Sequence, residues 1–239
     1  MKIYHPQTAL EAVRLRKENA ETAVYLAGGT DDLRLGGSAE GKDLIDLNVL
    51  GMDKIEIIGD KLVIGARCTL QDLVESELVP DFIREAAHFC SSFARRNAAT
   101  VGGNIGLRRD DSYLAAALTA ADAVLDCMTP HGEKEKKIAD YLQSSCKALI
   151  MNVIIDKNRS GWVRRFGNTA ASHAAVIAAQ SQGIFALSVH GSGLAYGTGP
   201  EIAETLTYHD DITGGADYKK YLAHTAFTLR RETNGTVEM

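Results

Sequence analysis

The sequence predicts an α+β fold with helices and strands in separate small units. Apolar residues recur at helical spacing between Thr8 and Asn19, next to the short apolar runs 23–27 and 43–47. Residues 54–66 form two β-rich runs on either side of a glycine turn, which is typical of a hairpin. Residues 162–196 alternate short strand-like runs with turns. We therefore expect a small βαβ unit, a middle region that combines a hairpin with helices, and a last region of short strands with a helical end.

Composition limits the function classes. The chain has 239 residues, 45% of them hydrophobic and 24% charged, as in an ordinary globular protein with one large or two to three small domains. Its formal net charge of −5 gives no general attraction to nucleic acid or to an anionic membrane, so we expect neither partner. The sequence shows no signal peptide and no apolar run of about 18 residues, which predicts a cytoplasmic location.

The four cysteines are widely spaced. They are Cys68, Cys90, Cys127 and Cys146, and no two form a C-x-x-C pair. Zinc and iron–sulfur sites usually have ligands at short spacing. We therefore interpret these residues as buried thiols, and expect any iron–sulfur chemistry on another chain.

The first unit is predicted to be a βαβ unit. A strand over residues 2–5 precedes a helix from Thr8 to Asn19, and the runs 23–27 and 43–47 are the next strands. Thr8 and Glu11 have the spacing of a capping box, in which each side chain accepts a backbone N–H of the other residue.

The middle of the chain mixes strands with apolar helices. Thr69 is a predicted helix cap, a further helix is expected from Phe82 to Phe93, and the alanine- and leucine-rich run Tyr113 to Ala121 should be a buried helix. Strands are expected at 123–127 and 148–155. A polar, turn-rich boundary follows at 157–161.

The C-terminal region is predicted to be rich in short strands. They are expected at 162–166, 170–179, 184–190 and 194–196. Pro200 is well placed in the first turn of a short helix, and apolar residues at helical spacing predict a last helix from Gly215 to Glu232.

Two glycine-pair stretches, 26–33 and 99–106, are the candidate binding elements. Glycine lets a ligand approach backbone N–H groups closely, and successive N–H groups form a nest of anion size. Two such nests would suit a diphosphate. Neither stretch has the dinucleotide or P-loop fingerprint, so two tight turns without a ligand remain an alternative.

Charged pairs flank the second stretch. Arg95-Arg96 and Arg108-Arg109 could form a basic patch for phosphate, but taken alone each pair is better explained as solvated surface. Asp110-Asp111 is interpreted as a helix cap or a solvated turn, because adjacent side chains point in different directions. The seven histidines are dispersed, and we predict no catalytic acid, base, nucleophile or metal ligand.

Three motifs together resemble one family. They are Leu26-Ala27-Gly28-Gly29-Thr30-Asp31, Lys61-Leu62-Val63-Ile64-Gly65-Ala66 and Arg96-Asn97-Ala98-Ala99-Thr100-Val101-Gly102-Gly103-Asn104-Ile105. In this order they resemble the FAD-binding subunit of molybdenum hydroxylases, the flavoproteins of xanthine dehydrogenase and carbon monoxide dehydrogenase. Residues 217–221 resemble that family's C-terminal domain. The resemblance implies a PCMH-type flavin fold of two α/β FAD-binding subdomains over 1–157, at about 1–53 and 54–157. It also implies a C-terminal domain of antiparallel strands and helices over 158–239.

The resemblance also implies a set of FAD-binding residues. They are Leu26, Ala27, Gly28, Gly29, Thr30, Asp31, Asp32 and Leu33 in the first stretch, and Thr100, Val101, Gly102, Gly103 and Asn104 in the second. Leu149 matches an apolar residue near the adenine, and Arg165, with Arg164 as its rival, matches a cationic residue of the third domain. The chain departs from the family pattern over Leu107–Tyr113, and Asn168 stands where a basic residue is usual.

The function implied is electron transfer. Electrons from a substrate oxidised at a molybdenum centre would pass through iron–sulfur clusters to FAD, and then to NAD⁺ or another acceptor. Iron–sulfur and molybdopterin-binding subunits would be separate partner chains. Two alternatives are a self-contained flavin oxidase of the vanillyl-alcohol-oxidase type, for which the short third domain leaves little room, and a flavin-free scaffold subunit.

Overall fold

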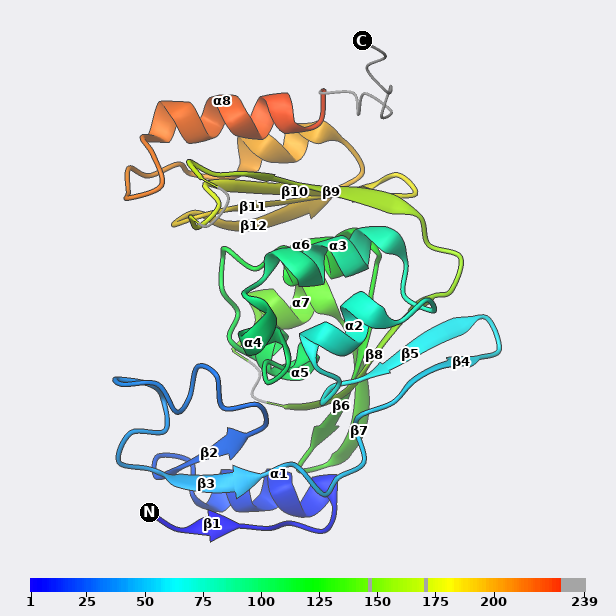
Figure 1. The fold of residues 1–239 in the computed structure, drawn as a ribbon, viewed down its shortest axis with the longest axis vertical. Helices are drawn as coiled ribbons and strands as arrows, with labels where there is room; N and C mark the ends of the chain where they lie inside the picture. Colours follow the sequence, from blue (N-terminus) through cyan, green and yellow to red (C-terminus); the bar gives the residue numbers. More distant parts are fainter. Residues whose placement is uncertain (146–147, 170–171, 229–239) are drawn as a thin grey trace.

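The computed structural model describes residues 1–145, 148–169 and 172–228. Its strands form three separate sheets of three, five and four strands. The N-terminal sheet, the central sheet and the C-terminal sheet follow one another along the long axis of the molecule, with helices between them (Figure 1). The mixed helix and sheet architecture confirms the predicted α+β class.

The N-terminal sheet is the predicted βαβ unit. Its order is β1 (Ile3–Tyr4), β3 (Asp43–Asp46), β2 (Ala23–Leu26), and both pairings are parallel. Helix α1 (Ala9–Glu18) contacts this sheet on one side and strands β6 and β8 of the central sheet on the other.

The predicted capping box of α1 forms only in part. The Thr8 hydroxyl accepts the Glu11 N–H at 3.2 Å, as expected. The Glu11 carboxylate, however, accepts the N–H of Gln7 at 2.7 Å, one residue earlier than a capping box requires.

The central sheet is antiparallel throughout. Its order is β4 (Ile55–Ile58), β5 (Lys61–Gly65), β8 (Leu149–Asp156), β6 (Val124–Thr129) and β7 (Gly132–Lys137). The predicted hairpin and the strands at 123–127 and 148–155 are therefore confirmed. Sequence reasoning missed β7, because this edge strand consists of alternating acidic and basic residues with no apolar side.

Six helices lie between the central sheet and the C-terminal sheet. They are α2 (Leu70–Glu75), α3 (Asp81–Phe89), α4 (Phe93–Arg96), α5 (Val101–Gly106), α6 (Tyr113–Ala120) and α7 (Ile138–Gln143). The helix predicted over 82–93 is wrong at its end, since α3 stops at Phe89 and a separate short helix follows. Every residue of α6 is buried, as its composition predicted.

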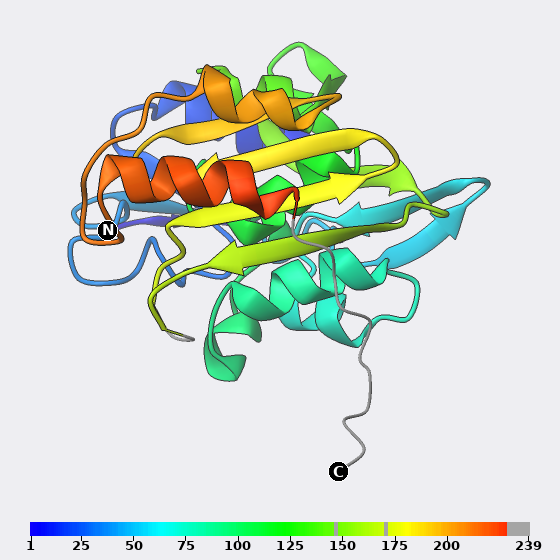
Figure 2. The ribbon, with the colours of Figure 1, turned by 90° about the horizontal axis from the view of Figure 1, so that it is seen from above.

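The C-terminal sheet covers α6. Its antiparallel order is β12 (Gly193–Gly197), β11 (Ile184–Val189), β10 (Val176–Ser181) and β9 (Gly161–Phe166), and α6 contacts all four strands. The 3₁₀ helix η1 (Pro200–Thr205) and α8 (Ala216–Ala226) lie on the opposite face (Figure 2). Apolar residues of the central sheet, α3, α6 and the inner face of the C-terminal sheet form one core.

Some sequence predictions in this region differ from the structure. The strand expected from residue 170 begins only at Val176, and residues 170–171 lie outside the described part. The predicted end of α8 at Glu232 and the thiol of Cys146 also lie outside it. In the described part of the chain, no helix is long and apolar enough to cross a membrane.

Candidate functional site

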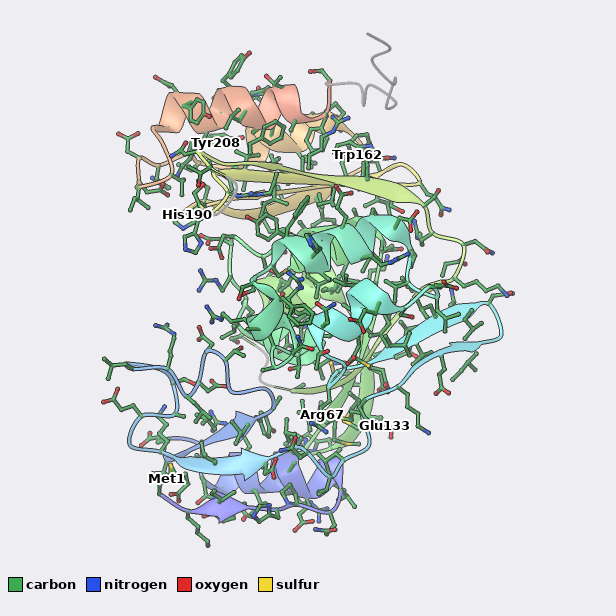
Figure 3. The ribbon with its side chains drawn as sticks, viewed as in Figure 1. Met1, Arg67, Glu133, Trp162, His190 and Tyr208 are labelled. Carbon is green, nitrogen blue, oxygen red and sulfur yellow. The ribbon has the colours of Figure 1, made fainter. Side chains whose placement is uncertain are left out.

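A cavity of about 610 Å³ lies where the N-terminal and central sheets meet. This volume is within the range of small-molecule and cofactor sites. Arg67 lies at this junction (Figure 3), where its guanidinium donates to the backbone oxygen of Asn48 at 2.8 Å. The predicted residues that line the cavity are Ala27, Gly28, Gly29, Thr30, Asp31, Asp32, Thr100, Gly102, Gly103, Asn104 and Leu149.

The first glycine stretch leaves its backbone donors available. It follows directly from β2, and Gly29 takes a positive φ of 67° that suits glycine. The turn is closed by a hydrogen bond that the Leu33 N–H donates to the Gly29 oxygen at 3.0 Å. Among the described residues, none accepts a hydrogen bond from the amides of Gly28 through Asp32. Those amides are free to bind an anion in the cavity.

The second glycine stretch uses its donors within the protein. Gly102 and Gly103 are in the first turn of α5, and not in a loop as predicted, because Thr100 caps this helix. The amides of residues 101–104 donate, in order, to Cys68 O at 2.9 Å, Ala66 O at 2.7 Å, Thr100 Oγ1 at 3.2 Å and Thr100 O at 2.9 Å. The predicted second anion nest is therefore wrong.

Glycine in the second stretch serves close packing instead. A Cβ at Gly102 would lie 2.8 Å from the Ala66 Cβ, closer than real Cβ contacts. The two stretches also pack on each other, because a Cβ at Gly28 would lie only 1.8 Å from the Ala98 oxygen. Arg95 adds a hydrogen bond of 3.0 Å to the Thr30 oxygen. The two stretches thus form one continuous wall of the cavity.

The basic pairs have roles beyond a solvated surface. Arg96 is buried, at 7% exposure, and donates to the side-chain oxygen of Gln71 at 2.9 Å and to the backbone oxygens of Ser91 and His88 at 2.6 and 3.1 Å. The Arg108 guanidinium lies 4.5 Å from the ring centre of Tyr141, and both residues line the cavity. The prediction of plain solvated surface is wrong for Arg96, because this side chain satisfies carbonyl groups around a turn.

Asp111 is the buried acid of the site. Its carboxylate accepts two hydrogen bonds from Arg109, at 2.7 and 2.8 Å, and lies 2.9 Å from Nδ1 of His173. Burial alone would raise the pKa of this carboxyl, but the bonds and charges of Arg109 and His173 outweigh burial and hold the pKa below its usual value. Asp110 and Asp111 lie in a turn, as expected, but neither caps α6, because Ser112 does, and Asp111 is buried rather than solvated.

Four predicted residues do not line the cavity: Leu26, Leu33, Val101 and Arg165. Val101 is fully buried in the core, and Leu33 is 57% exposed. Arg165 bonds the backbone oxygens of Thr169 and Ser172, and its guanidinium lies 5.7 Å from the ring centre of Tyr113, a lining residue.

The rival cation Arg164 belongs to a different region. It donates to the Ala226 oxygen of α8 at 2.7 Å and lies over the ring of Trp162 at 4.3 Å. Since successive strand residues face opposite sides, Arg164 and Arg165 are separated by the C-terminal sheet. Of the two, Arg165 is the residue near the cavity.

Sequence reasoning missed several lining residues. They include Arg16, Tyr25, Arg67, Tyr113 and His173, which come from separate elements. None belongs to a motif, and only their meeting in the fold makes them neighbours.

The lining fits an anionic cofactor that also has apolar groups. The hydroxyl of Tyr25 and Nε of Arg67 are buried and have no hydrogen-bond partner among the described residues, so a ligand could satisfy them. Leu47, Met52 and Leu149 supply apolar surface, and the first glycine stretch supplies amides. Burial raises the pKa of the Cys90 thiol to about 12, which disfavours the reactive thiolate form.

Comparisons with known proteins identify the family of the chain. A family described as "FAD binding domain in molybdopterin dehydrogenase" matches residues 1–157. The uncharacterized protein YgfM of Escherichia coli K12 is 32% identical over 177 residues, which are 74% of this chain and 67% of YgfM. YgfM of Escherichia coli O157:H7 matches equally.

Solved structures share the fold over almost the whole chain. The Cu,Mo-CO dehydrogenase in its cyanide-inactivated form contains a chain with a TM-score of 0.82 and 20% identity, with 94% of both chains covered. The carbon monoxide dehydrogenase of Hydrogenophaga pseudoflava gives a TM-score of 0.80 and 20% identity, with 94% of this chain and 93% of that chain covered. Quinoline 2-oxidoreductase of Pseudomonas putida 86 gives 0.81 and 17%, with 94% and 93% covered.

Proposed function

The chain belongs to the family of FAD-binding domains of molybdopterin dehydrogenases, and from this premise we propose that it is the electron-transfer flavoprotein subunit of a heteromeric molybdenum hydroxylase. It would carry FAD in the cavity between the N-terminal and central sheets. The domain division that goes with this proposal is 1–157 for cofactor binding and 158–239 for the C-terminal domain. The observation that carries it is the cavity wall built from both glycine stretches.

The residues of the first glycine stretch would hold the diphosphate of FAD. The amides of Gly28 through Asp32 have no acceptor among the described residues, and five arginines line the same cavity: Arg16, Arg67, Arg95, Arg108 and Arg109. Amide donors and guanidinium groups are the usual partners of phosphate oxygens. Leu149, with Leu47 and Met52, would pack against the adenine.

The other end of the cavity would receive the ring system that carries out redox chemistry. Tyr113, Asp111 and His173 line it there, between the glycine helix α5 and the C-terminal sheet. When bound, FAD supplies the redox chemistry, because flavins exchange electrons both with iron–sulfur clusters and with hydride acceptors. The protein residues named here would position the cofactor and exclude water.

Partner chains complete the proposal. Iron–sulfur clusters and molybdopterin would reside on separate subunits, and the final acceptor would be NAD⁺ or another oxidant. Support comes from the matched enzymes, whose names include molybdenum-containing CO dehydrogenases.

A visible spectrum of the purified chain, with the released cofactor identified by mass, tests the proposal. We expect a yellow protein that releases FAD, and additional iron–sulfur absorbance only after co-expression with partner subunits. A colourless chain that does not take up added FAD would refute cofactor binding and favour the flavin-free scaffold.

A further inference from the structure

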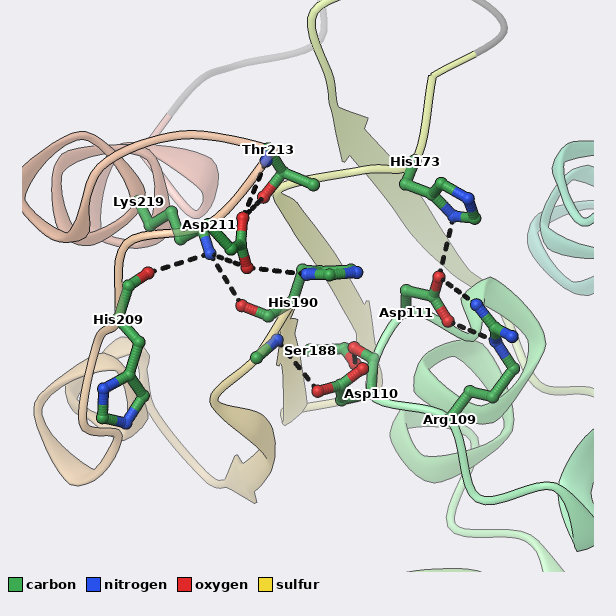
Figure 4. A network of polar contacts seen from close by, with 11 residues as sticks. Arg109, Asp110, Asp111, His173, Ser188, His190, His209, Asp211, Thr213 and Lys219 are labelled. Atoms are coloured by element: carbon green, nitrogen blue, oxygen red, sulfur yellow. Dashed lines mark hydrogen bonds and ion pairs between the residues drawn. The ribbon is translucent and has the colours of Figure 1, made fainter.

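The short segment 108–112, which we call the arm, joins the glycine helix α5 to the buried helix α6. Three consecutive arm residues contact three different parts of the molecule (Figure 4 shows the first two). Asp110 binds the C-terminal sheet, Asp111 binds Arg109 and His173 at the cavity, and the Ser112 hydroxyl donates to Asn104 Oδ1 of the glycine helix at 2.7 Å. The arm therefore connects the C-terminal sheet to the cavity through hydrogen bonds.

Asp110 is fixed by two hydrogen bonds from the C-terminal sheet. The buried Ser188 hydroxyl of β11 donates to the Asp110 backbone oxygen at 2.5 Å. The Gly191 N–H, in the turn between β11 and β12, donates to the Asp110 carboxylate at 2.9 Å. These two hydrogen bonds connect residues about 80 positions apart, so the conformation of the arm depends on tertiary contacts and not on its local sequence alone.

The turn that holds Asp110 is itself supported from behind. His190 precedes Gly191, and its Nδ1 lies 2.7 Å from the Asp211 carboxylate. Lys219 of α8 has no exposed side-chain surface and donates to that carboxylate and to the backbone oxygens of His190 and His209, at 2.9 and 3.0 Å. A buried ammonium with three acceptors is rigid, because moving it would leave charge unpaired away from water. The support extends from α8 to Asp110.

We propose that Asp110 is the positioning residue through which the C-terminal sheet holds the arm at the cavity and thereby sets the affinity for FAD. Asp110 does not line the cavity, whereas the next residue, Asp111, does. Loss of the Asp110 bonds would free the arm between its helices, so that Asp111, Arg109 and Asn104 would no longer be held in one arrangement. This inference rests on the proposed function for its cofactor readout only.

The test compares three variants of the full chain. Asp110→Ala removes the carboxylate, Asp110→Asn keeps an oxygen that accepts the Gly191 N–H, and Asp60→Ala removes an acid that is 85% exposed at the tip of the β4–β5 hairpin. FAD affinity is measured by fluorescence titration. We expect Asp110→Ala to weaken FAD binding about tenfold or more, since a hydrogen bond to a charged group is lost, and the other two to bind as the unchanged chain does.

A second measurement tests the role of Asp110 without the cofactor. Amide hydrogen exchange over 108–112, in the chain without FAD, should become faster in Asp110→Ala and in the milder Ser188→Ala, but not in Asp60→Ala. Unchanged exchange in both Asp110→Ala and Ser188→Ala would overturn the positioning role. An unchanged FAD affinity in Asp110→Ala would overturn it as well. If the unchanged chain does not bind FAD while exchange responds as expected, the proposed function fails and the role of Asp110 in the arm remains.

Discussion

The contact between the two glycine stretches yields the most direct prediction, the effect of Gly28→Ala. A Cβ at this position would lie 1.8 Å from the Ala98 oxygen, far inside the 3.4 Å at which ordinary van der Waals contact begins. The opposing segment cannot easily move away. The Ala99 oxygen accepts the Leu70 N–H at 2.8 Å, and the Ala98 and Ala99 amides both donate to the Arg95 oxygen. The first stretch itself must therefore shift.

The expected cost follows from that geometry. Forcing an additional methyl group into a closely packed contact costs about 1–3 kcal/mol of unfolding free energy. For a chain of this size, each kcal/mol lowers the melting temperature by about 2–4 °C. Because the displaced backbone carries the amides proposed for the diphosphate, we also expect at least a tenfold loss of FAD affinity, about 1.4 kcal/mol.

Chemical denaturation and FAD titration measure the two effects separately. Gly106→Ala, at the end of the glycine helix α5, is the stability control. Among the described residues, a Cβ there would have no heavy atom within 4 Å other than its chain neighbours and its own helix backbone. This control should leave the protein as stable as before, or more stable by about 0.4–1 kcal/mol. A Gly28→Ala chain with unchanged stability and unchanged FAD affinity would refute the close contact between the stretches.

Two other predictions concern the buried charges. Arg96→Lys should lower the free energy of unfolding by about 2–4 kcal/mol in chemical denaturation, because one ammonium cannot reach the three acceptors that the guanidinium spans. The control Arg34→Lys, in an exposed ion pair, should cost less than about 1 kcal/mol. Equal losses in the two variants would contradict the role of Arg96. The second concerns acid: since the folded-state pKa of Asp111 is below its unfolded value of about 3.9, its stabilisation is complete above that value and is lost as pH falls through the folded pKa. The melting temperature of Asp111→Asn should thus fall less steeply below about pH 4 than that of the unchanged chain, and parallel curves would contradict this.

Local sequence signals predicted the elements better than the site. The Thr69 cap, the hairpin at Gly59 and the buried helix α6 depend on residues a few positions apart, and all three were predicted correctly. Strand β7 was missed because its charged residues carry no apolar periodicity. The Asp111–His173 contact joins residues 62 positions apart, so no spacing rule could have shown it.

The two glycine stretches show why a motif of glycines does not by itself specify a phosphate site. Both contain a glycine pair, yet the amides of Gly28 through Asp32 have no acceptor in the described part of the chain, whereas those of residues 101–104 have protein acceptors. The difference arises from what lies beside each stretch. Thr100 starts helix α5, and the backbone oxygens of Ala66 and Cys68 accept the N–H groups of Gly102 and Val101. The segment between β2 and β3, in contrast, consists of turns. The neighbouring backbone thus determines whether the N–H groups of a glycine stretch are available to a ligand. For this reason we propose the diphosphate site at the first stretch and assign close packing to the second.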